Sequence, residues 1–159
     1  MKKSAQVIPA SMRAMYESFH FAAAARSGDL LLCSGQLGLG PDGRAIAEPA
    51  AQFAAAFANL KAVLAEAGLD FSDVLEITTF HVGLAQHLGS FMRAKDAALP
   101  EPYPAWTAIG ITELAVPGCL VEIRATAQLR KPAARAAVVK SKAKPTRAAK
   151  PAKKRPARR

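Results

Sequence analysis

Two segments of the chain show the apolar spacing of an amphipathic helix. In residues 49–67, large apolar side chains recur at intervals of four, three and four, at Phe53, Phe57, Leu60 and Leu64. Side chains at these intervals share one helix face. Pro49 suits the first helical turn and Gly68 the C-terminal cap. A second helix is predicted over residues 85–99, ending at Pro100, with a shared apolar face at Leu88, Phe91, Met92 and Leu99.

Other segments show the pattern of strands. Residues 119–129 alternate: the odd positions from Val121 onward are apolar and the even positions are polar, so one face should be buried and the other exposed. Residues 73–82 are rich in β-branched side chains and predict another strand, and a further one should begin at Ala105.

The N-terminal third predicts a hairpin. The stretch "SFHFAAAARSGDLLLCSGQ" indicates two short strands joined by a turn at residues 26–29, with an apolar and therefore buried second strand over Leu30–Ser34. Residues 1–16 are expected to be loose. The order β-β-α-β-α-β-β predicts an α+β domain over residues 17–130, with a single sheet and two helices on one of its faces.

The charge is divided unevenly along the chain. Residues 130–159 hold 13 of the 22 Lys and Arg residues and no acidic residue, so residues 1–129 carry 9 bases against 12 acids. The segment 131–159 consists mainly of Ala, Lys, Arg and Pro, and we expect it to be a disordered basic tail. Such a tail favours non-specific contact with phosphate backbones, although a solvated extension without a partner is the alternative.

Several kinds of site find no support in the pattern. Cys33 and Cys119 have neither CxxC spacing nor neighbouring histidines, which indicates free thiols and no metal site. The segment "SGQLGLGPDG" lacks the GK[ST] ending of a phosphate loop, and the chain has no GxSxG motif. Pro9 and Arg13 interrupt any signal-peptide core, and no apolar run is long enough to span a membrane. We therefore expect a cytoplasmic protein.

Glu122 lies on the polar face of the last predicted strand. A solvent-exposed glutamate is one interpretation. A general acid or base is the other, and it requires that something cover this face of the sheet. A symmetric partner could do so.

The motifs taken together resemble a known family. "LLCSGQLG", "NLKAVLAEAGLDFSDVLEITTF" and "PAWTAIGITELAVPGCLVEIRATA" occur in the order seen in the Rid family of reactive intermediate deaminases, also called YjgF-like proteins. The resemblance covers residues 19–129. It implies a chorismate-mutase-like fold and a homotrimer with clefts between subunits. It also implies cofactor-independent hydrolysis of reactive enamines and imines to carbonyl compounds and ammonia.

The resemblance also implies roles for particular residues. Glu122 matches the glutamate that positions water, while Ser34 and Gly35 match residues that line the cleft. Thr107 matches the last position of the family's P-A-R-[ST] motif, but Trp106 replaces the arginine that grips the substrate carboxylate. Indole has one N–H donor and no charge, so this replacement should weaken carboxylate binding by roughly two orders of magnitude.

Two further positions concern the same cleft. Phe21 falls near the place of a tyrosine that reaches the cleft in many members, which makes the cleft more apolar. Arg124, on the same strand face as Glu122, could supply a displaced positive charge. Three hypotheses follow: an imine or enamine hydrolase with altered substrate preference, a trimer that binds a small metabolite without turnover, and a nucleic-acid-associated protein that acts through its tail.

Overall fold

The computed structural model describes residues 5–130, and the predicted basic tail lies outside these residues. Six strands form one sheet in the order β1-β2-β3-β6-β4-β5. Their bounds are β1 Gln6–Val7, β2 Ala24–Ser27, β3 Leu30–Leu37, β4 Val74–Val82, β5 Ala105–Ile111 and β6 Val121–Gln128. The sheet is mixed, because β4 and β5 run parallel while every other neighbouring pair is antiparallel.

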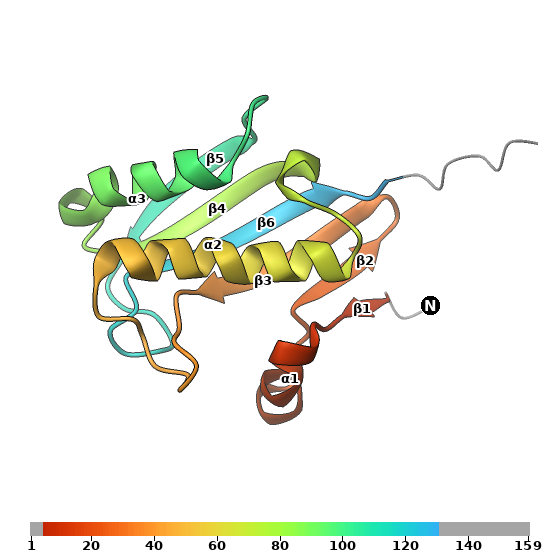
Figure 1. Cartoon of the computed structure of the whole chain (residues 1–159), viewed down its shortest axis with the longest axis horizontal. Coiled ribbons are helices and arrows are strands. Elements are labelled where there is room, and N and C mark those ends of the chain that lie inside the picture. The colour runs from red at the N-terminus through yellow and green to blue at the C-terminus, as the bar shows by residue number, and fades with distance from the viewer. Residues whose placement is uncertain (1–4, 131–159) are drawn as a thin grey trace, which may run out of the picture.

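Two helices, α2 (Pro49–Glu66) and α3 (Leu84–Ala98), cover the same face of the sheet (Figure 1). The four apolar residues predicted to share a face of α2 are each at most 3% exposed, which confirms that prediction. The carboxyl group of Glu48 accepts hydrogen bonds from the backbone of Ala50 and Ala51 and so caps the start of α2. In α3 the buried residues are Phe91 and Lys95, whereas Leu88 is 37% exposed, contrary to its predicted place on the buried face.

The central strand β6 alternates as predicted. Val121, Ile123, Ala125 and Ala127 are buried under the helices, while Arg124 and Gln128 are exposed on the opposite face. This opposite face has no helix from α2 or α3 over it (Figure 1). On β3, Leu31 and Cys33 are buried but Leu32 is 38% exposed, so this strand also has one open face and is not buried throughout as predicted.

The N-terminal segment is more ordered than its sequence pattern indicated. β1 pairs with β2, a 3-10 turn covers Ala10–Met12, and helix α1 follows over Arg13–Phe19. The predicted first strand was therefore placed too early, because residues 18 and 19 are helical and β2 begins only at Ala24. Helix α1 lies beside β1, away from the two longer helices (Figure 1).

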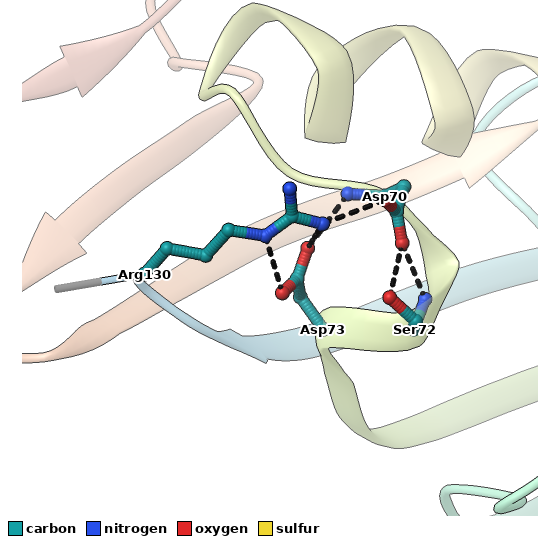
Figure 2. A network of polar contacts seen from close by, with 4 residues as sticks. All are labelled: Asp70, Ser72, Asp73 and Arg130. Carbon is teal, nitrogen blue, oxygen red and sulfur yellow. Dashed lines mark hydrogen bonds and ion pairs between the residues drawn. The ribbon is translucent and has the colours of Figure 1, made fainter. Parts of the chain in front are cut away.

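An ionic network fixes the last described residue (Figure 2). Arg130 donates to both carboxylate oxygens of Asp73 and to Asp70, at 2.6–2.9 Å. Asp70 also accepts hydrogen bonds from the backbone N–H and hydroxyl of Ser72. These hydrogen bonds lower the pKa of Asp70 to about 2, with the Ser72 hydroxyl as the main cause. The end of the described domain is thus tied to the short 3-10 helix Phe71–Asp73 before β4.

Candidate functional site

Strand β3 carries an irregularity at Ser34 and Gly35. Its register against β6 shifts between Cys33 and Gln36, which is the signature of a bulge. The segment is held by the residues just before β2: Ser34 donates through its backbone N–H to Ala23 O and through its hydroxyl to Ala22 O, at 2.9 and 2.8 Å. Gln36 donates to the Ser34 carbonyl oxygen at 3.0 Å. The Ser34 hydroxyl proton is therefore already used within the fold.

Glu122 lies directly against this bulge. It is paired in register with Leu37 on one side and Phe80 on the other, on the face of the sheet opposite α2 and α3. A Cβ atom at Gly35 would overlap the Glu122 carboxyl group and lie 2.6 Å from Glu122 Cγ. Only glycine permits this approach. Burial raises the pKa of Glu122 above its ordinary value, and none of the ion pairs within residues 5–130 involves this residue.

A pocket of about 480 Å³ opens beside Glu122 and the bulge. This volume falls within the range of small-molecule sites. Its walls come from α1 and the 3-10 turn before it, from β3, from Asn59 of α2 and from the loop before β6. The lining residues are Met12, Met15, Phe19, Phe21, Ser34, Gly35, Gln36, Leu37, Leu39, Asn59, Ala115, Val116 and Glu122.

Four of the seven predicted site residues thus meet at one pocket: Phe21, Ser34, Gly35 and Glu122. Thr107 and Arg124 do not line it. Both are exposed and lie in one row across the open face of the sheet, on either side of Thr78. Arg124 is two residues from Glu122 along β6, so a displaced charge from Arg124 is not part of this pocket.

Trp106 lies on the other face of the sheet. Its indole N–H donates to the hydroxyl oxygen of Thr79 at 2.9 Å, and its ring is 5.8 Å from that of Phe91 on α3. Thr79 is buried and also bonds to the buried His81 at 2.8 Å. The ammonium group of Lys95 lies 5.3 Å from the Trp106 ring. Within the chain, Trp106 therefore packs under α3 and not against Glu122.

The cysteines are not placed as reactive groups, and no metal-binding cluster accompanies them within residues 5–130. Burial raises the pKa of the Cys33 thiol to about 11, which keeps it protonated, and both cysteines are free and buried. Among residues 5–130, no group of three or more His, Cys, Asp or Glu side chains could hold a metal ion. No helix in this part of the chain is long and apolar enough to cross a membrane.

Sequence reasoning missed the contribution of α1 to the pocket. Met12, Met15 and Phe19 line it from a segment that was expected to be loose or extended. Their spacing of three and four is the helical signal that could have identified this wall, but a helix of seven residues offers few positions for such a test.

Comparison with known proteins identifies the fold. Residues 12–129 match the sequence profile of the family described as Endoribonuclease L-PSP. The chain belongs to this family. It is 38% identical over 130 residues to the RutC family protein YjgH of Escherichia coli strain K12, and the match covers 81% of this chain and 98% of YjgH.

Solved structures of L-PSP family relatives agree with this assignment. A YjgH structure matches with a TM-score of 0.75 and 37% identity, covering 82% of this chain and 99% of that one. RidA from the Antarctic bacterium Psychrobacter sp. PAMC 21119 matches with a TM-score of 0.65 and 26% identity, covering 81% and 99%. The resemblance to the Rid, or YjgF-like, family is confirmed, and so is the α+β fold with one mixed sheet.

Proposed function

We propose that this protein hydrolyses reactive imine or enamine intermediates to carbonyl compounds and ammonia, with Glu122 as the catalytic residue. The observation that carries the proposal is the contact between Gly35 and Glu122. A carboxyl group is held against a side-chain-free bulge, at the edge of a pocket of small-molecule size. The resemblance to the Rid family of reactive intermediate deaminases, to which the similarity to RidA also points, favours the same reaction class.

The chemistry needs one group that moves protons. An imine carbon is attacked by water, the water loses a proton, and the nitrogen gains one before ammonia leaves. A single carboxylate can accept the first proton and return it to the nitrogen. Burial raises the pKa of Glu122, so this carboxylate is a stronger base than one in water. The proposed reaction draws on no cofactor.

We also propose that the working form is a homotrimer, as the family resemblance implies. Leu32 and Ile109 are 38% and 39% exposed on the open face of the sheet, and a second copy could cover them. Light scattering coupled to size exclusion would test this. A stable monomer at micromolar concentration would contradict it.

The free cysteines support a reducing compartment such as the cytoplasm.

The reaction is tested with imines generated in situ by a flavin-dependent amine or amino acid oxidase, with ammonia or trapped imine as the readout. We expect Glu122→Gln to lower kcat/KM by about 10²–10⁴-fold, the usual contribution of a general acid or base. Glu66→Gln is the matched control, because it removes an exposed carboxylate of α2 outside the pocket.

The same variants separate an enzyme from a binding protein. If the wild type shows no turnover with any imine yet a ligand still raises Tm equally in wild type and Glu122→Gln, the protein binds without catalysis. Turnover that is equal in wild type and Glu122→Gln would contradict the role of Glu122.

A second candidate function is non-specific nucleic acid binding through residues 131–159. This segment carries twelve Lys and Arg residues and no acidic residue, while residues 1–129 are net acidic. Counterion release would then make the affinity for DNA or RNA fall steeply with salt. A comparison of full-length protein with a variant that ends at residue 130 tests this. Equal binding by both would exclude the tail as the cause.

A further inference from the structure

We propose that the Glu122 pocket takes imines that carry an apolar substituent and no carboxylate, and that helix α1 is the wall that recognises this substituent. The inference rests on the proposed hydrolysis for its chemistry, but it concerns which ligand the pocket accepts. It follows from three features of the described chain: the charge inside the pocket, the positions of the cations around it, and the composition of the α1 wall.

The pocket holds one ionisable group and it is acidic. Glu122 is the only charged residue among those that line the pocket within residues 5–130, and no Lys, Arg or His lines it. A ligand carboxylate would lose water without gaining a cation and would also lie near a second negative charge. A protonated imine carries the opposite sign and gains from the same carboxylate.

The nearest candidates for a carboxylate-binding cation are placed elsewhere. Arg124 is exposed on the open face opposite Thr78. Lys95 is paired with Asp96 at 2.5 Å and lies 5.3 Å from the ring of Trp106, on the helix-covered face. Arg13, on α1 itself, lines a separate hollow with Arg26 and Glu66. Within one subunit, none of these lines the pocket at Glu122.

The α1 side of the pocket is apolar and faces solvent. Met12, Met15 and Phe19 lie at spacings of three and four, so they form one side of this short helix and the turn before it. Met15 and Phe19 are 37% and 70% exposed, and Phe21 beside them is 40% exposed. An alkyl or aryl substituent in the pocket would cover these side chains. Methionine adapts readily to groups of different shape.

The reaction for this substrate class is balanced without an oxidant or reductant. R–CH=NH₂⁺ and H₂O give R–CHO and NH₄⁺. The C–O bond forms as water transfers a proton to the Glu122 carboxylate. The carboxyl group then returns this proton to the nitrogen of the carbinolamine. As the C–N bond breaks, the carboxylate accepts the hydroxyl proton, so that the aldehyde forms, and passes it to the departing NH₃, which leaves as NH₄⁺.

The test uses pairs of imines with the same side chain. A flavin-dependent amine oxidase converts 3-methylbutylamine and 2-phenylethylamine to carboxylate-free imines. An L-amino acid oxidase converts leucine and phenylalanine to the matching 2-imino acids. We expect kcat/KM to be at least about tenfold higher for the carboxylate-free member of each pair. It should also rise by about threefold for each methylene added to a linear amine. Equal rates, or a preference for the 2-imino acid, would overturn the inference while leaving the proposed hydrolysis intact.

Variants of α1 test the wall itself. Met15→Ala with Phe19→Ala should reduce kcat/KM more for 2-phenylethylamine-derived imine than for propylamine-derived imine. Leu75→Ala, an exposed apolar residue of β4 outside the pocket, is the control and should change neither. Met15→Arg places a cation in the pocket and should shift the preference toward the 2-imino acid. The same fractional loss for both imines in the double variant would contradict recognition by α1.

A binding measurement decides the inference even without turnover. The amines themselves are stable cations with the same substituent and the same charge as the protonated imines. We expect 3-methylbutylamine to raise Tm, or to bind in calorimetry, more strongly than leucine does at the same concentration. Stronger binding of leucine would overturn the inference. Absence of turnover with both imine classes, together with preferred amine binding, would contradict only the proposed hydrolysis.

Discussion

The polar side chains on the two faces of the sheet have different surroundings. Under α3, the indole of Trp106, the hydroxyl of Thr79 and the imidazole of His81 are hydrogen-bonded in sequence, and the ring of Phe91 packs on both Trp106 and His81. On the opposite face, Glu122 lies beside a pocket, and its pKa is raised by burial alone. Under α3 the Trp106 N–H and the Thr79 hydroxyl are satisfied by neighbours, which stabilises the fold, although the buried His81 Nδ1 has no hydrogen-bond partner among the described residues. Glu122 faces a pocket, so its carboxyl group is available to a ligand.

Trp106 belongs to the helix-covered face. Its register with Ile77 places it on the helix-covered face of this chain. The prediction that it forms a wall of a cleft between subunits stays a prediction. The motif correctly identified the family, and within one chain the Trp106 side chain has its partners in Thr79 and Phe91.

The largest effect should come from the helix-covered face. Phe91→Ala removes a fully buried ring that packs against Phe53, Phe57, His81 and Trp106 at 4.6–5.8 Å between ring centroids. We expect a loss of about 3–5 kcal/mol in the free energy of unfolding, measured by denaturant titration. Phe19→Ala is the matched control, because that ring is 70% exposed. Similar losses for both variants would contradict the division between core and pocket wall.

The next effect concerns the contact at the bulge. Gly35→Ala forces the Glu122 side chain to move, so we expect kcat/KM for imine hydrolysis to fall by at least about tenfold. Stability should fall less than in Gly38→Ala, whose new methyl group would overlap the backbone carbonyl of Gln52. Gly89→Ala in α3 would place its methyl group no closer than 4.0 Å to the Arg93 side chain, so it should be neutral or slightly stabilising. Full activity of Gly35→Ala would show that the geometry of Glu122 does not matter for turnover.

Trp106→Phe should have a moderate effect on stability. It keeps an aromatic ring but removes the N–H that donates to Thr79, and the expected loss is about 1 kcal/mol. A double-mutant cycle with Thr79→Val isolates the coupling between the two side chains. A loss of activity greater than that of Gly35→Ala would show instead that Trp106 reaches the ligand.

Glu122→Gln should increase stability in a pH-dependent way. Burial raises the pKa of Glu122 in the folded state, so ionisation of this group disfavours folding as pH rises through that pKa. The variant has no such group, and we expect its Tm to exceed that of the wild type at pH 7. The difference should shrink toward pH 4 and below, where the carboxyl is protonated in both states. A lower Tm at pH 7 would indicate that the carboxylate is stabilised by its surroundings.

The smallest effect should come from Arg130. Its ion pairs with Asp70 and Asp73 are exposed, so Arg130→Ala should lower Tm only slightly at low salt and not at all at about 1 M salt. The pKa of Asp70 is lowered, so its contribution is present above its ordinary pKa and is lost as pH falls toward 2. A loss that persists at high salt would indicate packing by the Arg130 side chain instead.

Much of the fold could be predicted because its signals are local and long. The α2 face and the β6 alternation follow from repeated spacing over many residues, and the end of α3 follows from Pro100. Leu88 and α1 were missed for the opposite reason. Leu88 lies near the edge of the apolar stripe, where packing decides burial, and α1 spans only seven residues.

The sequence by itself determined the family, the period of the main elements and the side of β6 on which Glu122 lies. Only the tertiary structure decided which residues lie next to Glu122 on that side. It brought Gly35 to within contact of Glu122, placed the α1 residues Met15 and Phe19 beside both, and turned Trp106 toward Phe91. Periodicity specifies the face of an element, but the neighbour of that face depends on strand register and on chain segments far apart in sequence.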